Sequence, residues 1–340
     1  MKNILHIDGS QGEAGGQVLR TSLSLSMITG TPVCIEKIRA GRAKPGLMRQ
    51  HLACVKAAQV ITDAEVSGAE VGSTRIVFKP KAIKAGDYHF AVGTAGSTLL
   101  IFQTVFPALA LADNESHVTF EGGTHNMLAP SFDFVALAYL PVLQQMGFEV
   151  SMQLKRYGFY PQGGGHWQAT IKPVADIRAL ELLQTGDLLD QEAVATSANI
   201  PAHVAVRELA EIAKQCQWPS AALKSQQVDC RGNGNILSIR LYHENCVEVV
   251  ESVGKIGVSA EKIARQAIKM IHRYQATAAP VGEHLADQLL LPMAIGAGGV
   301  FRTLKPSSHT LTNMAVIQHF MNRPFKQTEI AKDCWEIQQG

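Results

Sequence analysis

The order of strand-like and helix-like segments repeats along the first half of the chain, and this repeat constrains the fold more than any other feature. Each pass begins with a short apolar run and continues through a glycine-rich loop into a helical stretch. A second strand, a second helix and two further strands follow. The second helices of the two passes begin at Leu47 and Phe132, 85 residues apart. Such a separation indicates a repeated β-α-β-α-β-β unit.

The two passes are expected to contain the same elements in the same order. In the first pass, the apolar patterns predict strands over 4–7, 33–38, 64–66 and 74–78, and helices over 17–28 and 47–61. In the second pass, they predict strands over 88–92, 118–121, 149–154 and 167–171, and helices over 97–112 and 132–146.

A third copy of the unit is complete only if other sequence interrupts it. Residues 282–292 resemble another loop with its first helix, and 311–320 is typical of the second helix. Phe132 and Thr310 mark the second helices of the second and third copies. If an insert of about 94 residues is removed between them, their separation becomes about one repeat length. The candidate insert contains predicted strands at 236–241 and 246–251 and predicted helices at 204–216 and 260–274. We therefore predict an α/β (α+β) fold with a large domain of three repeats, 1–184 plus 277–340, and a smaller inserted α/β domain, 185–276.

The composition excludes several other classes of protein. Of the 340 residues, 46% are hydrophobic and 18% are charged, which excludes wholesale disorder, collagen and a coiled coil. The longest apolar stretch, 99–112, is too short and too interrupted to span a membrane. The N-terminus meets a charge before a signal-peptide core could form. Six scattered cysteines without a C-x-x-C pair argue against a zinc site and a disulfide scaffold, and indicate a cytoplasmic protein.

The first glycine-rich loop, 9–16, places Glu13 among glycines at the start of a predicted helix. Glycines allow close backbone approach, and the amides of a helix N-terminus attract phosphate. The loop is neither a Walker loop nor a G-x-G-x-x-G motif. It is equally typical of a turn with a solvated acid. Alternatively, the Glu13 carboxylate holds a divalent metal ion that bridges phosphate oxygens.

One stretch of the chain is strongly basic although the net charge is only +2. From Lys37 to Thr62 there is no acid, and the cations are Lys37, Arg39, Arg42, Lys44, Arg49 and Lys56. Guanidinium groups in a loop can bind phosphates in bidentate fashion. Most charge runs are solubilising surfaces, but the missing acid favours anion binding. Any contact with nucleic acid must use such a local patch.

Two further motifs stand out. Residues 156–165 read Arg-Tyr-Gly-Phe-Tyr-Pro-Gln-Gly-Gly-Gly. The three consecutive glycines indicate a backbone conformation that other residues rarely adopt, and a tight connection between two strands would also require it.

His309 lies in a polar stretch, 305–313, at the start of a predicted helix. Most histidines are structural or on the surface. An imidazole at a helix start, among hydroxyl groups, can nevertheless serve as a nucleophile.

Together these motifs resemble those of the RNA 3′-terminal phosphate cyclase family, and the resemblance runs from Ile4 into the C-terminal helix. Its segments are Asp8-Gly-x-x-Gly-Glu13-x-Gly-Gly-Gln17, Arg39-Ala-Gly-Arg-x-Lys-Pro-Gly-Leu47, Gly158-Phe-Tyr-Pro-x-Gly-Gly-Gly165 and His309-x-Leu-Thr-Asn313. Tyr157 stands where the family often has histidine or arginine.

The resemblance implies three repeats with a small domain inserted in the third, and a reaction that uses ATP and a divalent metal (Mg or Mn). His309 would attack the α-phosphate of ATP and become adenylylated, releasing pyrophosphate. AMP would then pass to the 3′-phosphate of RNA. Attack by the adjacent 2′-hydroxyl would expel AMP and leave a 2′,3′-cyclic phosphate. Transfer of AMP through the histidine gives the 3′-phosphate a leaving group, which a monophosphate lacks. The 2′-hydroxyl that attacks is on the same ribose and is already within reach.

The resemblance also assigns roles to individual residues. His309 is the nucleophile and Glu13 the metal-binding acid. The residues expected to hold phosphates or the RNA end are Arg20, Arg39, Arg42 and Gln50. Those expected to form the nucleotide pocket are Gln103, Pro130, Glu283, His284, Asp287 and Gln288. Pro130 would form a wall for adenine, and His284 replaces an expected phenol ring that would stack on it.

Two other functions are considered. Non-catalytic relatives of the family act in ribosome assembly and lack the nucleophilic histidine, so His309, Glu13 and the arginine loop favour the enzyme. Enolpyruvyl transferases have similar repeats, so the fold alone does not distinguish them. They are not expected to carry the 158–165 and His309 motifs. Recognition of RNA is expected to be loose, because a terminal phosphate and sugar are recognised rather than base edges.

Overall fold

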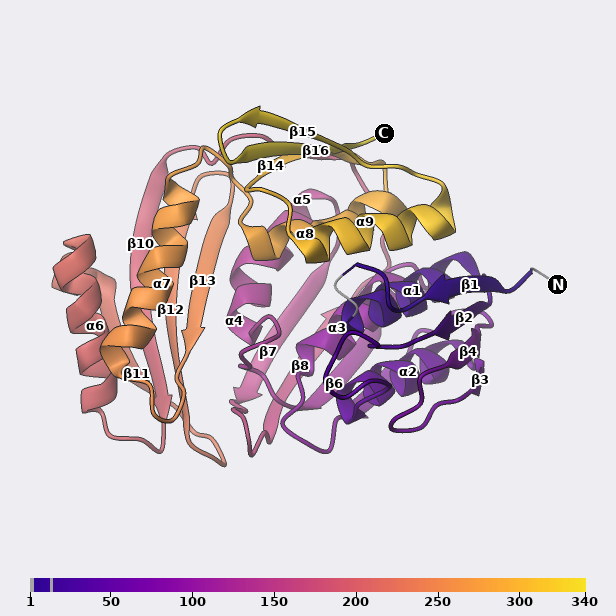
Figure 1. Ribbon diagram of the computed structural model, residues 1–340, viewed down its shortest axis with the longest axis horizontal. Coiled ribbons are helices and arrows are strands. Elements are labelled where there is room, and N and C mark those ends of the chain that lie inside the picture. Colours follow the sequence, from indigo (N-terminus) through magenta and orange to yellow (C-terminus); the bar gives the residue numbers. More distant parts are fainter. Residues whose placement is uncertain (1–2, 13–14) are drawn as a thin grey trace.

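A computed structural model describes residues 3–12 and 15–340 of the chain. Within these residues the strands form four mixed sheets of four strands each, with helices packed against them (Figure 1). The helices predicted from the apolar patterns are confirmed, with ends that differ by a few residues.

The first sheet has the strand order β1-β2-β4-β3. β1 and β2 are parallel, and the other two pairs are antiparallel. The inward residues of β2 and β4 are fully buried beneath the two helices of this part of the chain, as alternating apolar residues require. The elements are β1 (Leu5–Asp8), α1 (Gly16–Thr29), β2 (Val33–Glu36), α2 (Arg49–Thr62), β3 (Glu65–Ser67) and β4 (Ile76–Lys79).

The second sheet has the order β5-β6-β8-β7 and the same pattern of one parallel and two antiparallel pairs. The helix predicted over 132–146 contains a π-helical turn, η1. We attribute this turn to Pro141, which has no N–H to continue the regular helical bonds. The elements are β5 (Asp87–Ala91), α3 (Leu99–Leu109), β6 (Ser116–Gly122), α4 (Phe132–Phe134), η1 (Val135–Tyr139), α5 (Leu140–Gln145), β7 (Val150–Arg156) and β8 (Gly165–Ile171).

The third sheet has the order β15-β16-β14-β9 and again contains one parallel pair, β9 with β14. None of its strands was predicted from the sequence. β9 has only three residues, and β15 is exposed along its whole length, so neither carries an apolar alternation. The elements are β9 (Leu180–Leu182), α8 (Glu283–Ile295), β14 (Gly299–Thr303), α9 (Ser308–Met321), β15 (Lys326–Ala331) and β16 (Cys334–Gln339).

The chain between β9 and α8 forms the fourth sheet, with the order β11-β10-β12-β13. Two long amphipathic helices, α6 and α7, pack against it and bury their apolar faces. The predicted strands correspond to β12 and β13, while β10 and β11 were missed. The elements are β10 (Leu188–Ala198), α6 (His203–Cys216), η2 (Ser220–Ala222), β11 (Leu223–Gln227), β12 (Gly234–His243), β13 (Val247–Val253) and α7 (Ala260–Gln275).

The sheets surround two main apolar cores. One core is continuous through the first three sheets and their helices, and Val249 of β13 also packs into it. The other lies between the fourth sheet and helices α6 and α7. In Figure 1 the fourth sheet stands at the left and the first sheet at the right, with α8 and α9 above α1. Helices from opposite ends of the sequence therefore lie together.

Two further observations concern the described residues as a whole. None of their helices is both long and apolar enough to cross a membrane. All six cysteines are free thiols, and five of them are buried.

Candidate active site

His309 lies in the first turn of α9, and its side chain is exposed. The turn is capped by Ser307, whose hydroxyl accepts a hydrogen bond from the backbone N–H of Thr310 at 3.2 Å. The imidazole Nδ1 lies 2.7 Å from Oε1 of Gln17, in the first turn of α1. The cap and this contact hold the ring at the junction of two helices that come from opposite ends of the chain.

The Gln17 side chain selects the tautomer of the neutral His309 ring. Its Nε2 donates to Oδ2 of Asp287 on α8 at 2.9 Å. An amide has one donor group and one acceptor oxygen, so Oε1 of Gln17 accepts from Nδ1 of His309. The neutral imidazole thus carries its proton on Nδ1 and its lone pair on Nε2. A nitrogen nucleophile requires such a lone pair.

A second set of hydrogen bonds fixes the three helices around Asp287. Nδ2 of Asn313 donates to the backbone carbonyl of Asp287 at 2.7 Å, and the hydroxyl of Thr21 donates to Oδ1 of Asn313 at 2.8 Å. Burial raises the pKa of the Asp287 carboxyl above its ordinary value, while the Gln17 hydrogen bond and nearby cationic groups oppose this shift. α1, α8 and α9 are therefore joined by polar contacts directly behind His309.

A cavity of about 60 Å³ opens among these helices and brings several predicted residues together. Its lining consists of Gln17, Arg20, Thr21, Ser24, Gln103, Pro107, Tyr139, Asp287, Gln288, Leu291 and Asn313. Nε2 of Gln103 donates to Oε1 of Gln288, whose own Nε2 donates to the backbone carbonyl of His284 at 2.8 Å. Four predicted residues, Arg20, Gln103, Asp287 and Gln288, thus share one polar cavity.

Three residues expected in the nucleotide pocket lie outside this lining. Glu283 forms an ion pair with Arg273 of α7 at 2.7 Å, and His284 is exposed at the start of α8. Pro130 lies in the loop before α4, next to the cap residue Ser131.

The basic loop is held by one of its own arginines. Arg39 is 9% exposed, and its Nη1 donates to the backbone carbonyls of Lys44 at 2.6 Å and Gly46 at 2.9 Å. These bonds close the 39–46 loop on itself. Arg42, in the same loop, is exposed. Arg39 therefore shapes the loop, and Arg42 is the more open of the two guanidinium groups.

His51 lies close to two of the predicted arginines. Burial lowers its pKa to about 3, and the positive charges of Arg20 and Arg39 add to this effect. The backbone N–H of Met48 donates to its Nδ1 at 3.2 Å, so the single ring proton is on Nε2. A Cβ on Gly16 would lie 2.5 Å from this Nε2 atom and 2.8 Å from Nη1 of Arg20. Two cations and an N–H donor therefore gather at the first turn of α1, which suits an anion.

Gln50 precedes His51 in the first turn of α2 and faces the second glycine loop. A Cβ built on Gly96 would lie 3.0 Å from the Cβ of Gln50. The glycine at this position therefore lets the 93–97 loop lie against the helix that carries Gln50 and His51.

Glu13 lies outside the described residues. The preceding residue, Gly12, packs on α9, where a Cβ would come 1.9 Å from the Thr312 hydroxyl. The first glycine-rich loop thus reaches the helix that carries His309. The described residues contain no group of three or more His, Cys, Asp or Glu side chains suited to a metal ion. Mg²⁺ bound through one or two carboxylates and substrate phosphates needs no such group.

Several residues of this site received no role from the sequence, among them Gln17, His51, Tyr139 and Asn313. Gln17 and Asn313 end the first and last matched motifs, so their place in the motifs was a usable signal. His51 was hidden because its value lies in contacts with Arg20 and Gly16, more than 30 residues away in sequence. Tyr139 reaches the cavity from the π-helical turn, which has no simple sequence signature.

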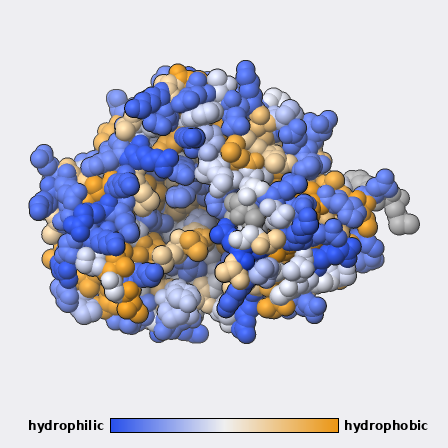
Figure 2. All heavy atoms as spheres, in the orientation of Figure 1, coloured by the Kyte–Doolittle hydropathy of each residue, from blue (hydrophilic) through white to orange (hydrophobic). Residues whose placement is uncertain are grey.

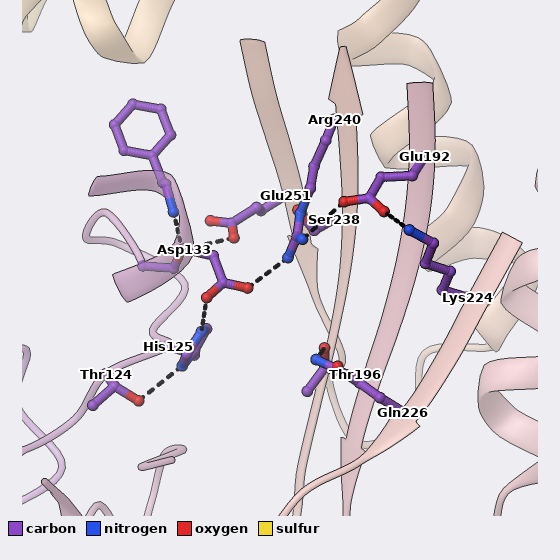
Figure 3. A network of polar contacts seen from close by, with 12 residues as sticks. Thr124, His125, Asp133, Glu192, Thr196, Lys224, Gln226, Ser238, Arg240 and Glu251 are labelled. Atoms are coloured by element: carbon purple, nitrogen blue, oxygen red, sulfur yellow. Dashed lines mark hydrogen bonds and ion pairs between the residues drawn. The ribbon is translucent and has the colours of Figure 1, made fainter. Parts of the chain in front are cut away.

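A buried polar network ties the fourth sheet to the loop before α4 (Figure 3). Arg240 of β12 is at its centre: its guanidinium donates to Asp133 at 2.6 Å and to Glu192 at 3.0 Å. Ser131 donates to Glu251 of β13 at 2.7 Å and also caps α4. Burial raises the pKa of Glu251 to about 7. The loop that carries Pro130 is therefore held by strands β12 and β13.

Comparison with known proteins identifies the family. The model of the family described as RNA 3′-terminal phosphate cyclase matches residues 11–327. A curated relative from Koribacter versatilis (strain Ellin345), named RNA 3′-terminal phosphate cyclase, is 48% identical over 329 residues, which cover 96% of this chain and 92% of the relative. With matches of this extent, the chain belongs to the RNA 3′-terminal phosphate cyclase family.

Proposed function

We propose that this protein is an ATP-dependent enzyme that converts the 3′-terminal phosphate of RNA into a 2′,3′-cyclic phosphate, through a covalent histidine–AMP intermediate. ATP is a substrate of the family. The observation that carries the proposal is the arrangement of His309, Gln17 and Asp287, because it leaves a lone pair on Nε2 of an exposed imidazole.

In the first step, Nε2 of His309 attacks the α-phosphorus of ATP. The bond between this phosphorus and its bridging oxygen to the β-phosphate breaks, and pyrophosphate leaves. The ring becomes positively charged while its Nδ1 proton stays hydrogen-bonded to Gln17. The Asp287 carboxyl accepts a hydrogen bond from the same amide and stabilises the positive charge of the ring indirectly, through Gln17.

In the second step, an oxygen of the RNA 3′-phosphate attacks the phosphorus of the bound AMP. The P–N bond breaks and the electron pair returns to Nε2. In the third step, the RNA 2′-oxygen attacks the 3′-phosphorus, AMP leaves, and the hydroxyl proton passes to solvent. The third step is intramolecular, so holding the RNA end in one orientation supplies much of the acceleration.

The phosphates would be held by Arg20, Arg39, Arg42 and Gln50. Support comes from the place of Arg20, which lines the cavity and also lies beside His51 and Gly16. Since the hydrogen bonds of Arg39 close its own loop, Arg39 would hold the loop in the shape that exposes Arg42 to a phosphate. A neutral His51 adds a hydrogen-bond donor without a third positive charge.

The nucleotide pocket would be formed by Gln103, Gln288 and Asp287, with Glu283, His284 and Pro130 nearer its entrance. The exposed His284 ring at the start of α8 can stack on a base. A divalent metal would be held by Glu13 together with substrate phosphates, and would neutralise charge on the leaving pyrophosphate. Support for this position is the contact between Gly12 and the His309 helix.

The fold would be three copies of one unit with an insertion. Three sheets share a strand order and a pattern of one parallel and two antiparallel pairs. The fourth sheet, with α6 and α7, occupies the chain between β9 and α8, which favours 185–276 as an inserted domain and 1–184 plus 277–340 as the catalytic one. Free cysteines throughout suit a cytoplasmic location.

The test is covalent labelling with α-labelled ATP and a divalent metal ion. The wild-type protein should form an acid-labile AMP adduct, and His309→Ala should form none. His319→Ala, on the same helix, is the matched control and should label normally. If His309→Ala takes up label as well as the wild type, the covalent mechanism is wrong. If the wild type fails to label and also fails to cyclise RNA, the protein belongs with the non-catalytic relatives.

A further inference from the structure

The loop between β7 and β8 presents an exposed tyrosine on a well-packed support. Tyr160 is 77% exposed, whereas the preceding Phe159 is 1% exposed, with its ring centroid 5.5 Å from that of His125. The backbone N–H of Gly163 donates to the carbonyl of Phe159 at 2.7 Å. Because the backbone around it is held, the Tyr160 ring would lose little conformational entropy when another group stacks on it.

Two glycines allow this loop to pack closely against neighbouring segments. Gly163 and Gly164 have φ angles of 65° and 75°. A Cβ on Gly163 would lie 2.8 Å from Cα of Ala95, and one on Gly164 would lie 2.6 Å from Cδ of Arg231. The loop therefore packs on the 93–97 loop and on the aliphatic stem of Arg231, which lies between β11 and β12.

The same 93–97 loop leads to the residues proposed to hold the RNA end. Gly96 of this loop lies against Gln50, next to the cluster of His51, Arg20 and Arg39. The 93–97 loop therefore connects the support of Tyr160 with the proposed position of the terminal phosphate. With the terminal phosphate bound at that position, a base at Tyr160 would belong to a nucleotide that precedes the terminal one.

The surface around Tyr160 combines apolar and cationic groups. The loop of Met127 and Leu128 adjoins the Tyr160 loop through a backbone bridge between His125 and Phe159, and these two residues are 61% and 94% exposed. Nε of Arg156 donates to the carbonyl of Gly164 at 2.7 Å. The ion pairs with acids in the described part of the chain involve neither Arg156 nor Arg231. Figure 2 shows the molecule hollowed between the fourth and first sheets, with apolar residues along the lower edge of the hollow. Proteins bind single-stranded RNA with aromatic rings and guanidinium groups placed side by side.

From these contacts we infer an upstream-nucleotide subsite, formed by Tyr160, Met127, Leu128, Arg156 and Arg231, that binds single-stranded RNA. Tyr160 stacks on the base of a nucleotide upstream of the 3′ end, and the two guanidinium groups face its phosphate. The inference rests on the proposed function, because RNA is the substrate considered. Stacking accepts any base, so the subsite adds affinity for longer RNAs without selecting a sequence.

The test measures binding of a fluorescent, 3′-phosphorylated hexanucleotide by anisotropy without ATP, so that no catalysis is needed. The RNA is intact, or carries one abasic residue at the second, third or fourth position from the 3′ end. In the wild type, the abasic residue at one of these positions should weaken binding about tenfold. In Tyr160→Ala, the intact RNA should bind about tenfold more weakly, and the abasic residue should add no further loss. Tyr160→Phe should behave as the wild type.

Two controls separate this subsite from the catalytic site. Ile256→Ala, at an exposed apolar residue in the turn between β13 and α7, should leave RNA binding unchanged. Labelling by ATP should be unchanged in all three variants. If abasic residues weaken binding equally in the wild type and Tyr160→Ala, the subsite is wrong even when labelling succeeds. If the abasic residue weakens binding in the wild type but not in Tyr160→Ala, while ATP labels none of the proteins, the subsite stands and only the proposed function is contradicted.

Discussion

In the proposed mechanism, the chemistry of His309 depends on the Gln17 amide. It accepts from the imidazole and donates to Asp287, so one side chain selects the tautomer and links it to a carboxyl group. Both contacts involve residues more than 260 positions away in the sequence. The sequence placed Gln17 in a motif next to Glu13, but its role follows only from the packing of α1 on α8 and α9.

Removal of this amide should slow adenylylation much more than it affects folding. In Gln17→Ala the His309 ring loses the amide that orients it, and it also populates the tautomer that has no lone pair on Nε2. We expect the rate of AMP transfer to fall about 100-fold, mainly because the ring is no longer held in its reactive orientation. Single-turnover labelling measures the rate. Ser22→Ala is the matched control, since its hydroxyl is buried on the same helix without a hydrogen-bond partner in the described part of the chain. Equal rates for Gln17→Ala and the control would show that the amide does not set the tautomer.

At the scale of elements, the N-terminus of α1 is a junction at which several loops and helices meet. Gly16 lies against His51 of α2 and Arg20 of its own helix, and there is no room for a side chain between them. The residue is helical with an ordinary φ, so glycine is used here for close approach rather than for backbone freedom.

Gly16→Ala should therefore affect function more than stability. Alanine favours the helix, but its Cβ would displace the His51 ring or the Arg20 guanidinium. We expect the KM for the RNA 3′-phosphate to rise about tenfold, the loss expected for one charge-assisted hydrogen bond, with little change in melting temperature. Gly30→Ala is the converse control, because Gly30 ends α1 with a φ of 63°. That variant should lose about 1 kcal/mol of stability and keep its KM. Equal KM values for Gly16→Ala and wild type would contradict this account.

The elements also show what a sequence can reveal. α7 was predictable because apolar residues such as Ile263, Ala267 and Ile271 recur at helical spacing and are buried. β15 was not, since every residue in it is exposed and only its pairing with β16 makes it a strand. His309 could be singled out because it lies in a motif, and Asp287 because the family resemblance implies a place in the nucleotide pocket. Contacts that depend on tertiary packing, such as Gly16 with His51, could not.

At the scale of the whole molecule, the fourth sheet is joined to the rest through the network around Arg240. This guanidinium is 12% exposed and serves two carboxylates, one from the second sheet's helix and one from β10. Removal of such a partner leaves buried negative charges uncompensated. The attachment therefore depends on polar contacts as well as on apolar packing.

Arg240→Met should destabilise the protein by about 3–5 kcal/mol, the cost of breaking a buried ion pair. Loosening of the loop that carries Pro130 should also raise the KM for ATP. Arg207→Met is the matched control, because Arg207 makes an exposed bidentate pair with Glu261 and should cost about 1 kcal/mol or less. Denaturant unfolding of the three proteins gives the comparison. Equal losses for the two variants would mean that the network around Arg240 does not hold the fourth sheet in place.

The bond between Gln17 and His309 joins positions that are 292 residues apart. A ribosome makes Gln17 well before it makes α9, so the two side chains meet only after the 291 residues between them have been translated. In the proposed mechanism, a nascent chain that still lacks α9 therefore cannot form the AMP adduct.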